Sequence, residues 1–188
     1  FAVVFPKQVQ FVAKKFWRYF GEGLSVRCAK SLLAGRVINN SNDCEAVEKI
    51  KQQIADDTGQ NCDDVFIYPS GMAAVSAVHR SLTSITPDAR SVQFDFPYVD
   101  VLKIQKEIGS GVVFLPCANN DSIFELEKII NDGEQLCGIY CELPSNPLLR
   151  SADLASIKRI ISPTKTPIVV DDTVATNVNV DVFKYADV

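Results

Sequence analysis

The stretch from Leu136 to Asp171, LCGIYCELPSNPLLRSADLASIKRIISPTKTPIVVD, decides the fold class. It begins with an apolar run at residues 136–141, which is typical of a buried strand. Residues 153–161 then place apolar side chains at helical spacing, and residues 167–170 form a second apolar run. A strand, a helix and a strand with short connections predict a parallel unit, with the helix packed on the sheet.

The same alternation continues on the N-terminal side of this stretch. Three more apolar runs predict strands, at residues 65–68, 91–94 and 112–115. Each of these runs is followed by a segment with helical spacing, at residues 71–82, 99–108 and 121–131. Two earlier helices are predicted, at residues 9–19, ended by Gly21, and at 44–58, capped by 41–43. We therefore expect an α/β fold, a mainly parallel sheet with helices on both faces, which binds ligands at the carboxyl ends of its strands.

The composition excludes several classes of protein. The chain has 188 residues, of which 47% are hydrophobic and 22% are charged, so it is not a disordered chain. Its 19 basic and 23 acidic residues give a net charge of −4, which offers no positive field for a nucleic acid. It contains no apolar run of about 18 residues, so we expect no membrane span.

The cysteines and the histidine indicate no metal site. Six cysteines include no Cys-x-x-Cys pair, and His79 is the only histidine. Cys117, Cys137 and Cys141 lie in apolar, strand-like runs, so we expect reduced, buried thiols in a cytoplasmic protein. We expect His79 at a helix surface or an interface, without a catalytic role.

The segment Ser70-Gly71-Met72-Ala73-Ala74 joins a predicted strand to a predicted helix. Ser70 is placed to cap the helix, and Gly71 lets a ligand approach the backbone closely. The unpaired N–H groups at the start of a helix suit a phosphate. A Ser-Gly pair is also an ordinary helix start, and neither a Gly-x-Gly-x-x-Gly nor a Walker loop is present.

Three further residues follow predicted strands, and each has two interpretations. Asp171 is either a metal ligand, a base or a partner for a ligand cation, or it caps the following turn. Asn146, with Pro144 and Pro147 on either side, either donates its amide to a ligand oxygen or stabilises the loop. Tyr98 either offers its ring to a planar ligand or packs at the edge of the sheet.

Together these loops resemble the pyridoxal-phosphate-dependent Cys/Met metabolism (trans-sulfuration) family over about residues 60–188. Four motifs agree in order and spacing: Ser-Gly-Met-Ala-Ala at 70–74, the tyrosine at 98, Glu-x-Pro-x-Asn-Pro at 142–147 and Val-Asp-x-Thr-x-Ala-Thr at 170–176. Two other stretches are similar to the fungal-type cystathionine γ-synthase branch, Gly-Glu-Gly-Leu-Ser-x-Arg at 21–27 and Phe-Pro-Tyr-Val-Asp at 96–100.

The resemblance implies part of the large domain of a PLP-dependent transferase, which is aspartate aminotransferase-like and of fold type I. It also implies pyridoxal 5′-phosphate (PLP) as the cofactor and seven contacts with it. The phosphate is expected at Ser70 and at the N–H groups of Gly71 and Met72. Tyr98 is expected to stack on the ring, and Asn146 to bind the ring hydroxyl oxygen. Asp171 is expected to pair with the ring nitrogen, and Thr173 to support the ring from the same strand end.

The resemblance further implies an enzyme that joins an activated homoserine to cysteine by γ-replacement, in trans-sulfuration and methionine biosynthesis. Cystathionine lyase, methionine γ-lyase and homoserine sulfhydrylase share the same motifs, and a non-catalytic scaffold is another alternative. The Schiff-base lysine is expected beyond Val188, so residues 1–188 alone are expected to be inactive. Residues 1–42 match weakly and residues 43–188 form the partial PLP-binding domain, in a parent expected to be a cytoplasmic homodimer or homotetramer.

Overall fold

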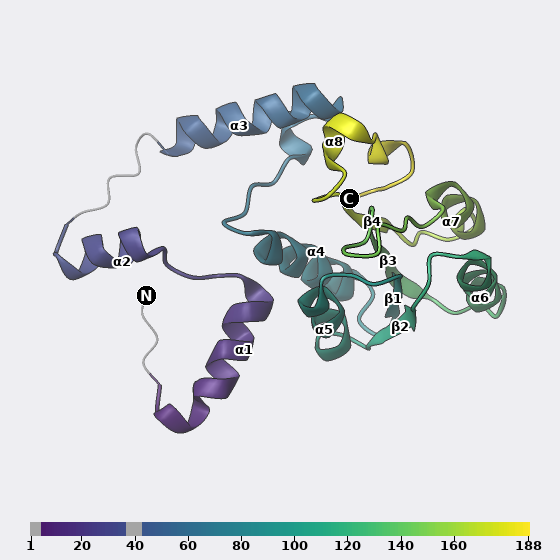
Figure 1. Ribbon diagram of the computed structural model, residues 1–188, viewed down its shortest axis with the longest axis horizontal. Coiled ribbons are helices and arrows are strands. Elements are labelled where there is room, and N and C mark those ends of the chain that lie inside the picture. Colours follow the sequence, from purple (N-terminus) through teal and green to yellow (C-terminus); the bar gives the residue numbers. More distant parts are fainter. Residues whose placement is uncertain (1–4, 37–42) are drawn as a thin grey trace. The chain divides into compact units, whose positions relative to one another are not determined.

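The computed structural model describes residues 5–36 and 43–188, and the chain divides into two compact units, Phe1–Ser76 and Ala77–Val188. The first unit is helical (Figure 1). Its elements are η1 (Lys7–Val9), α1 (Gln10–Phe20), α2 (Val26–Leu33), α3 (Asp43–Thr58), η2 (Cys62–Asp64) and the start of α4 (Gly71–Ile85). Helices α1 and α3 confirm two predictions, whereas α2 was not predicted. The cap predicted at residues 41 and 42 lies outside the described residues.

Helix α1 ends as its sequence predicts. Gly21 adopts the left-handed conformation, with a φ of 59°, and its N–H donates to the carbonyl oxygen of Trp17. A residue without a side chain accepts this φ at little cost, and glycine is common directly after a helix for that reason. The turn brings the Gly21 carbonyl to the first residues of α4, where the Ser70 hydroxyl donates to it over 3.0 Å.

The strand predicted at residues 65–68 is wrong. The backbone at Val65 is extended, but none of the described residues forms a strand beside this segment. Phe66 is 72% exposed, so the apolar run is not buried as it would be in the middle of a sheet. An apolar run favours an extended backbone, whereas a strand also needs a neighbour that supplies its hydrogen bonds.

The second unit contains the other four predicted strands in one parallel sheet. They are β1 (Arg90–Phe94), β2 (Val112–Leu115), β3 (Leu136–Glu142) and β4 (Ile168–Asp171), and their order is β2-β1-β3-β4. The register pairs Phe94 with Leu115 and Cys141, and it pairs Glu142 with Asp171. The carboxyl ends of the strands therefore lie together at one edge of the sheet.

Helices cover both faces of this sheet, as predicted. They are the second half of α4, α5 (Val99–Glu107), α6 (Asn120–Asn131) and α7 (Leu154–Ile161), followed by the short α8 (Thr176–Asn179) and η3 (Val182–Lys184). Helices α6 and α7 pack beside each other on one face, opposite α5 (Figure 1). Parallel strands need crossover connections that return the chain to the same end of the sheet, and helices supply them.

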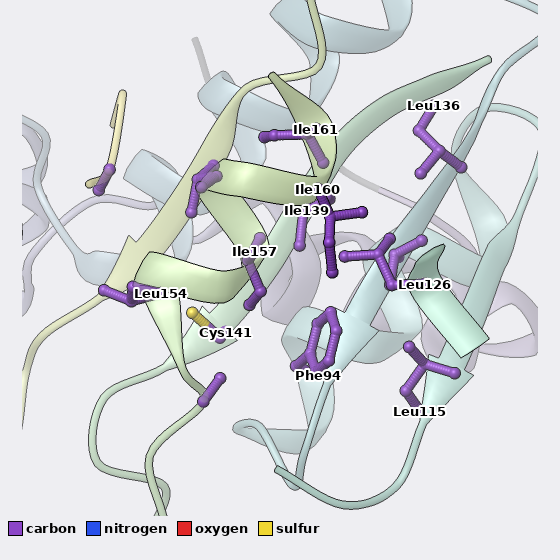
Figure 2. Close-up of a cluster of buried hydrophobic side chains, with 14 of the residues drawn as sticks. Phe94, Leu115, Leu126, Leu136, Ile139, Cys141, Leu154, Ile157, Ile160 and Ile161 are labelled. Atoms are coloured by element: carbon purple, nitrogen blue, oxygen red, sulfur yellow. The ribbon is translucent and has the colours of Figure 1, made fainter. Parts of the chain in front are cut away.

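The face under α6 and α7 is apolar. Leu126 of α6 and Ile157 of α7 are fully buried against Phe94 and Ile139 of the sheet (Figure 2). Alternate strand residues point to this face, so Phe94 and Cys141 belong to the same cluster. This core holds the strands in register and so holds the residues at their carboxyl ends in place.

The face under α4 and α5 is polar. Gln105 of α5 donates to Gln93 of β1 over 2.7 Å and accepts from the Ser91 hydroxyl over 2.8 Å. His79 of α4 lies 3.0 Å from the Tyr140 hydroxyl and 2.9 Å from the Ile108 carbonyl oxygen. Paired polar groups in a core fix one arrangement of the elements, because any other arrangement leaves a buried group unsatisfied.

The expectation that His79 lies at a helix surface or an interface is wrong, because the side chain is only 1% exposed. Burial lowers the pKa of His79, although its hydrogen bond to the Ile108 carbonyl opposes this shift. The sequence gives α4 an apolar face, but it does not show that Tyr140 reaches that face from the sheet. Of the three cysteines expected to be buried, Cys137 and Cys141 are buried, whereas Cys117, beyond the end of β2, is partly exposed.

Within the part of the chain that the structure describes, no helix combines the length and the apolar character that crossing a membrane requires.

Candidate functional site

Asp171 is the last residue of β4, and its carboxylate is held by the turn that follows. The N–H of Thr173 donates to Asp171 Oδ1 over 3.1 Å, and the Thr173 hydroxyl donates to the same oxygen. Among the described residues, no group donates to the other oxygen, Oδ2. One side of the carboxylate is thus fixed by the turn and the other is available. The cap interpretation of Asp171 is correct, and it does not compete with ligand binding.

Tyr98 lies at the N-terminus of α5, just beyond the end of β1. The residue is 53% exposed, and its backbone N–H donates to Glu142 Oε2 over 2.8 Å. The helix start is therefore attached to the end of β3, the strand beside β1 in the sheet. An aromatic ring that is half exposed, on a backbone that is held in this way, can offer one face to a planar ligand.

Asn146 lies in the loop that follows β3, between two cis peptide bonds, Leu143–Pro144 and Asn146–Pro147. Its backbone N–H donates to Glu142 Oε1 over 3.0 Å, and its side chain is exposed. The loop is also closed on itself, because the Ser145 N–H donates to the Arg150 carbonyl oxygen over 2.8 Å. These bonds place the Asn146 loop beside Tyr98.

Three of the predicted ring contacts therefore share one edge of the sheet. Glu142 joins the backbones of Tyr98 and Asn146, and it lies in register with Asp171 on the adjacent strand. Residues that face each other on parallel strands point to the same face of a sheet. The carboxyl edge of β1, β3 and β4 thus presents a ring, an amide and a carboxylate within one small region.

Carboxylates dominate the electrostatics of this edge. Burial raises the pKa of Glu142, the N–H groups of Tyr98 and Asn146 lower it, and Asp171 and Asp95 raise it. Burial and the charge of Asp171 raise the pKa of Asp172. The same two causes raise the pKa of the Cys141 thiol to about 12, which keeps it protonated. A region with this much negative charge favours a ligand that presents a cation.

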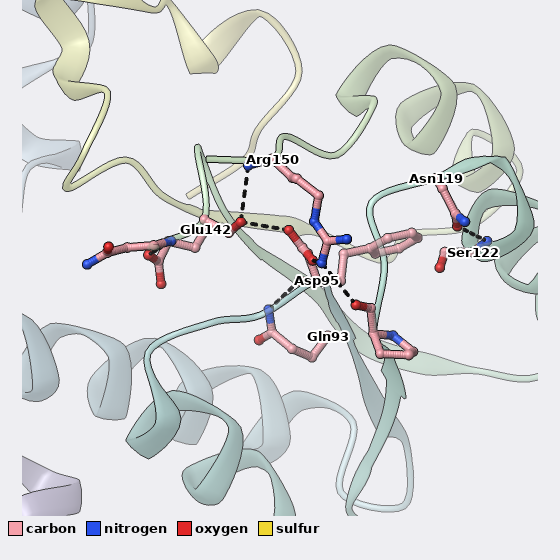
Figure 3. Close-up of polar contacts among 10 residues, drawn as sticks. Gln93, Asp95, Asn119, Ser122, Glu142 and Arg150 are labelled. Atoms are coloured by element: carbon pink, nitrogen blue, oxygen red, sulfur yellow. Dashed lines mark hydrogen bonds and ion pairs between the residues drawn. The ribbon is translucent and has the colours of Figure 1, made fainter. Parts of the chain in front are cut away.

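An ion pair that the sequence did not reveal, between Asp95 and Arg150, links the loops at this edge. Asp95, the residue after β1, is 2% exposed and has a φ of 54°. Arg150 donates to its Oδ1, and the Ser145 hydroxyl donates to its Oδ2 over 2.7 Å (Figure 3). Arg150 also donates to the Pro116 carbonyl oxygen over 3.4 Å. The loops after β1, β2 and β3 are thereby tied together.

Ser70, Gly71 and Met72 belong to the first unit, at the start of α4. The Ser70 hydroxyl accepts from the Ala73 N–H over 3.2 Å, which confirms the predicted helix cap. The N–H groups of Gly71 and Met72 donate to no other described residue. Two unpaired donors at a helix start, together with the partial positive charge of the helix dipole, suit a phosphate group.

The comparisons with known proteins agree with this chemistry. The sequence model of the family described as "Cys/Met metabolism PLP-dependent enzyme" matches residues 32–188. The chain belongs to this family. The family depends on PLP, so the cofactor is the one that the four motifs indicated.

Curated relatives agree with this assignment. A cystathionine gamma-synthase of Neurospora crassa is 38% identical over 132 residues, covering 67% of this chain and 21% of the relative. A cystathionine gamma-synthase of Saccharomyces cerevisiae is 35% identical over 144 residues, covering 66% of this chain and 22% of the relative. The chain thus spans about a fifth of the length of these curated relatives.

Among solved structures, a NifS-like protein matches 90% of this chain and 46% of its own chain, with a TM-score of 0.57 and 14% identity. This match concerns the fold, which is that of the large domain of fold type I PLP-dependent enzymes, as expected.

The polar groups at the sheet edge and those at the start of α4 fit PLP. Asp171 Oδ2, an anionic oxygen to which no described residue donates, suits a protonated ring nitrogen, and the exposed amide of Asn146 suits a ring oxygen. The Tyr98 ring offers a surface for stacking, and the N–H groups of Gly71 and Met72 offer two donors for the phosphate. The ring nitrogen, the ring oxygen, the ring face and the phosphate therefore each have a group of suitable chemistry in this chain.

Proposed function

We propose that this chain carries cofactor-binding residues of an enzyme that transfers the carbon chain of an activated homoserine to the sulfur of cysteine, as a cystathionine γ-synthase does. One observation carries the proposal: the three ring-contact candidates lie together at one sheet edge in a chain that is 38% identical to a cystathionine gamma-synthase. The four motifs of this chain match those of the trans-sulfuration family, and the names of the relatives favour this reaction within the family.

In this proposal Asp171 carries the main electrostatic role. PLP, when bound, supplies an electron-accepting ring that stabilises negative charge on the substrate. Asp171 Oδ2 accepts a hydrogen bond from the protonated ring nitrogen and keeps that proton in place. Thr173 holds Asp171 Oδ1, so the carboxylate is oriented before the ring binds. The negative charge that gathers at this edge stabilises the positive ring nitrogen.

The other residues bind and orient. Tyr98 stacks on the ring, Asn146 donates to the ring hydroxyl oxygen, and the N–H groups of Gly71 and Met72 hold the phosphate beside the Ser70 cap. Activated homoserine and cysteine as substrates belong to the proposal, as does a homodimer or homotetramer. The domain boundary between residues 42 and 43 also stays a prediction.

The experiment compares Asp171→Asn with Asp172→Asn in the full-length protein. Both variants remove one carboxylate at the end of β4, but only Asp171 is expected to face the ring nitrogen. We expect Asp171→Asn to lower γ-replacement turnover by about a hundredfold, since a contact between charged groups worth about 3 kcal/mol corresponds to that factor. Asp172→Asn should stay within about threefold of the parent. Unchanged turnover in Asp171→Asn would show that the role given to Asp171 is wrong.

The products distinguish the reaction from its alternatives. With an O-acylated homoserine and cysteine, γ-replacement yields cystathionine. A lyase cleaves cystathionine or methionine instead, and a homoserine sulfhydrylase uses sulfide in place of cysteine. A full-length protein that binds PLP but catalyses none of these reactions would support a non-catalytic relative.

A further inference from the structure

We propose that Glu142 is a positioning residue, whose carboxylate sets the Tyr98 ring and the Asn146 amide at a fixed spacing for the cofactor ring. This inference rests on the proposed function, because it assigns a purpose to contacts at the same site. It goes further by assigning to one side chain the relative placement of two loops.

The geometry of Glu142 suits this purpose. Glu142 is the last residue of β3, and the strand has neighbours on both sides, β1 and β4. The side chain is 8% exposed, and each carboxylate oxygen has one backbone donor, the Tyr98 N–H on Oε2 and the Asn146 N–H on Oε1. A single planar group on a rigid strand therefore sets the separation of the two backbones.

The side chains of Tyr98 and Asn146 need such support, because both are exposed. Among the described residues, the backbone N–H groups of Tyr98 and Asn146 have no acceptor other than Glu142. A hydrogen bond from a backbone N–H to a carboxylate is stronger than one to a neutral oxygen. Tyr98 lies 44 positions before Glu142 in the chain, so the contact joins segments that the sequence keeps far apart.

The carboxylate also has a cost, which argues for a purpose beyond stability. Burial and the charges of Asp171 and Asp95 disfavour the ionised form of Glu142. A glutamine of the same shape would avoid that cost, but it offers only one acceptor, and its NH₂ group would face a second N–H group. With one N–H group on each side of the planar group, as here, a carboxylate accepts both donors, whereas an amide accepts on one side only.

The experiment uses the full-length protein loaded with PLP and compares Glu142→Gln with Glu134→Gln. Glu134 pairs with Arg90 at the other end of the sheet, so its variant removes an acidic side chain with hydrogen bonds far from the site. The readouts are the PLP dissociation constant and the circular dichroism of the bound cofactor, which reports the environment of its ring. We expect Glu142→Gln to bind PLP at least about tenfold more weakly and to lose most of the cofactor dichroism. We expect Glu134→Gln to match the parent in both.

A second variant, Glu142→Asp, tests the same idea with the charge retained. Its side chain is one methylene shorter, so we expect it to lose at least one of the two N–H groups and to show the same loss of dichroism. Parent-like affinity and dichroism in Glu142→Gln, with Asp171→Asn still impaired, would overturn this inference and leave the proposed function standing. Failure of the parent itself to bind PLP would overturn the proposed function. If both Glu142 variants fail to fold, Glu142 serves the stability of the fold, and the positioning role is wrong.

Discussion

Replacing Arg150 with methionine removes the cationic partner of a buried carboxylate while keeping much of the apolar length of the side chain. The side chain of Asp95 is 2% exposed, whereas that of Arg150 is 42% exposed. The variant leaves Asp95 with the hydrogen bond from the Ser145 hydroxyl. It also frees the Pro116 carbonyl oxygen from its contact with Arg150.

The expected cost follows from this partial burial. Removing one partner of a fully buried ion pair costs about 3–5 kcal/mol. The arginine is nearly half exposed, so water takes over part of its role, and we expect about 2 kcal/mol. Asp95→Asn in the Arg150→Met background should recover about 1 kcal/mol, because the buried charge is then gone. Asparagine also tolerates the positive φ of Asp95, so this second change adds little strain.

Hydrogen exchange of the β3 amides is the suitable assay, because β3 lies in the middle of the sheet and all its residues are buried. The single tryptophan, Trp17, lies in the first unit and does not report on the sheet. A loss of about 2 kcal/mol predicts exchange about thirtyfold faster in Arg150→Met. The control is Arg159→Met, at an exposed position of α7, and it should change the free energy of unfolding by less than about 0.5 kcal/mol.

Exchange in Arg150→Met within about threefold of the parent would refute this reasoning. So would a full additive loss in the double variant, because the two side chains would then not act as a pair.

Two further predictions concern other parts of the fold. Gly21→Ala should destabilise the first unit by about 2 kcal/mol, because a Cβ atom there has an unfavourable φ of 59° and would lie 2.4 Å from the Ser70 hydroxyl oxygen. Gly59→Ala has the unfavourable φ without the clash, so it should destabilise the first unit less. Unfolding followed by Trp17 fluorescence measures both variants, and an equal loss of unfolding free energy in the two would contradict this explanation. For His79, burial lowers the folded-state pKa, so the unfolded state binds a proton first as the pH falls below about 6.5, and stability should decrease there. His79→Gln should remove this part of the pH dependence in urea unfolding; an unchanged slope would show that His79 is not its source.

Four of the five strands predicted from apolar runs are present in the sheet. The run at 136–141 is apolar and is followed at once by loop residues, and β3 occupies Leu136–Glu142. The run at 65–68 carries the same signal, yet it forms no strand among the described residues. Hydropathy indicates an extended, apolar segment, but the hydrogen-bonding neighbour of a strand is a property of the whole fold.

The residues of the site also include some that the sequence predicted and some that it did not. The common location of Asp171, Asn146 and Tyr98 was predictable because each follows a strand, and the carboxyl ends of parallel strands meet at one edge. Their contacts with PLP stay a prediction. Asp95 was not predicted, although it also follows a strand, because its partner Arg150 lies 55 positions further along the chain. Glu142 was visible only as part of a motif, because its two donors are backbone N–H groups, which no residue type reveals.

The most direct test of the central claim is an experimental structure of the full-length protein with PLP bound. The account predicts the ring nitrogen about 3 Å from Asp171 Oδ2, the Tyr98 ring stacked on the cofactor and the phosphate at the N–H groups of Gly71 and Met72. A ring nitrogen that faces any other group, or a phosphate bound away from the start of α4, would contradict it.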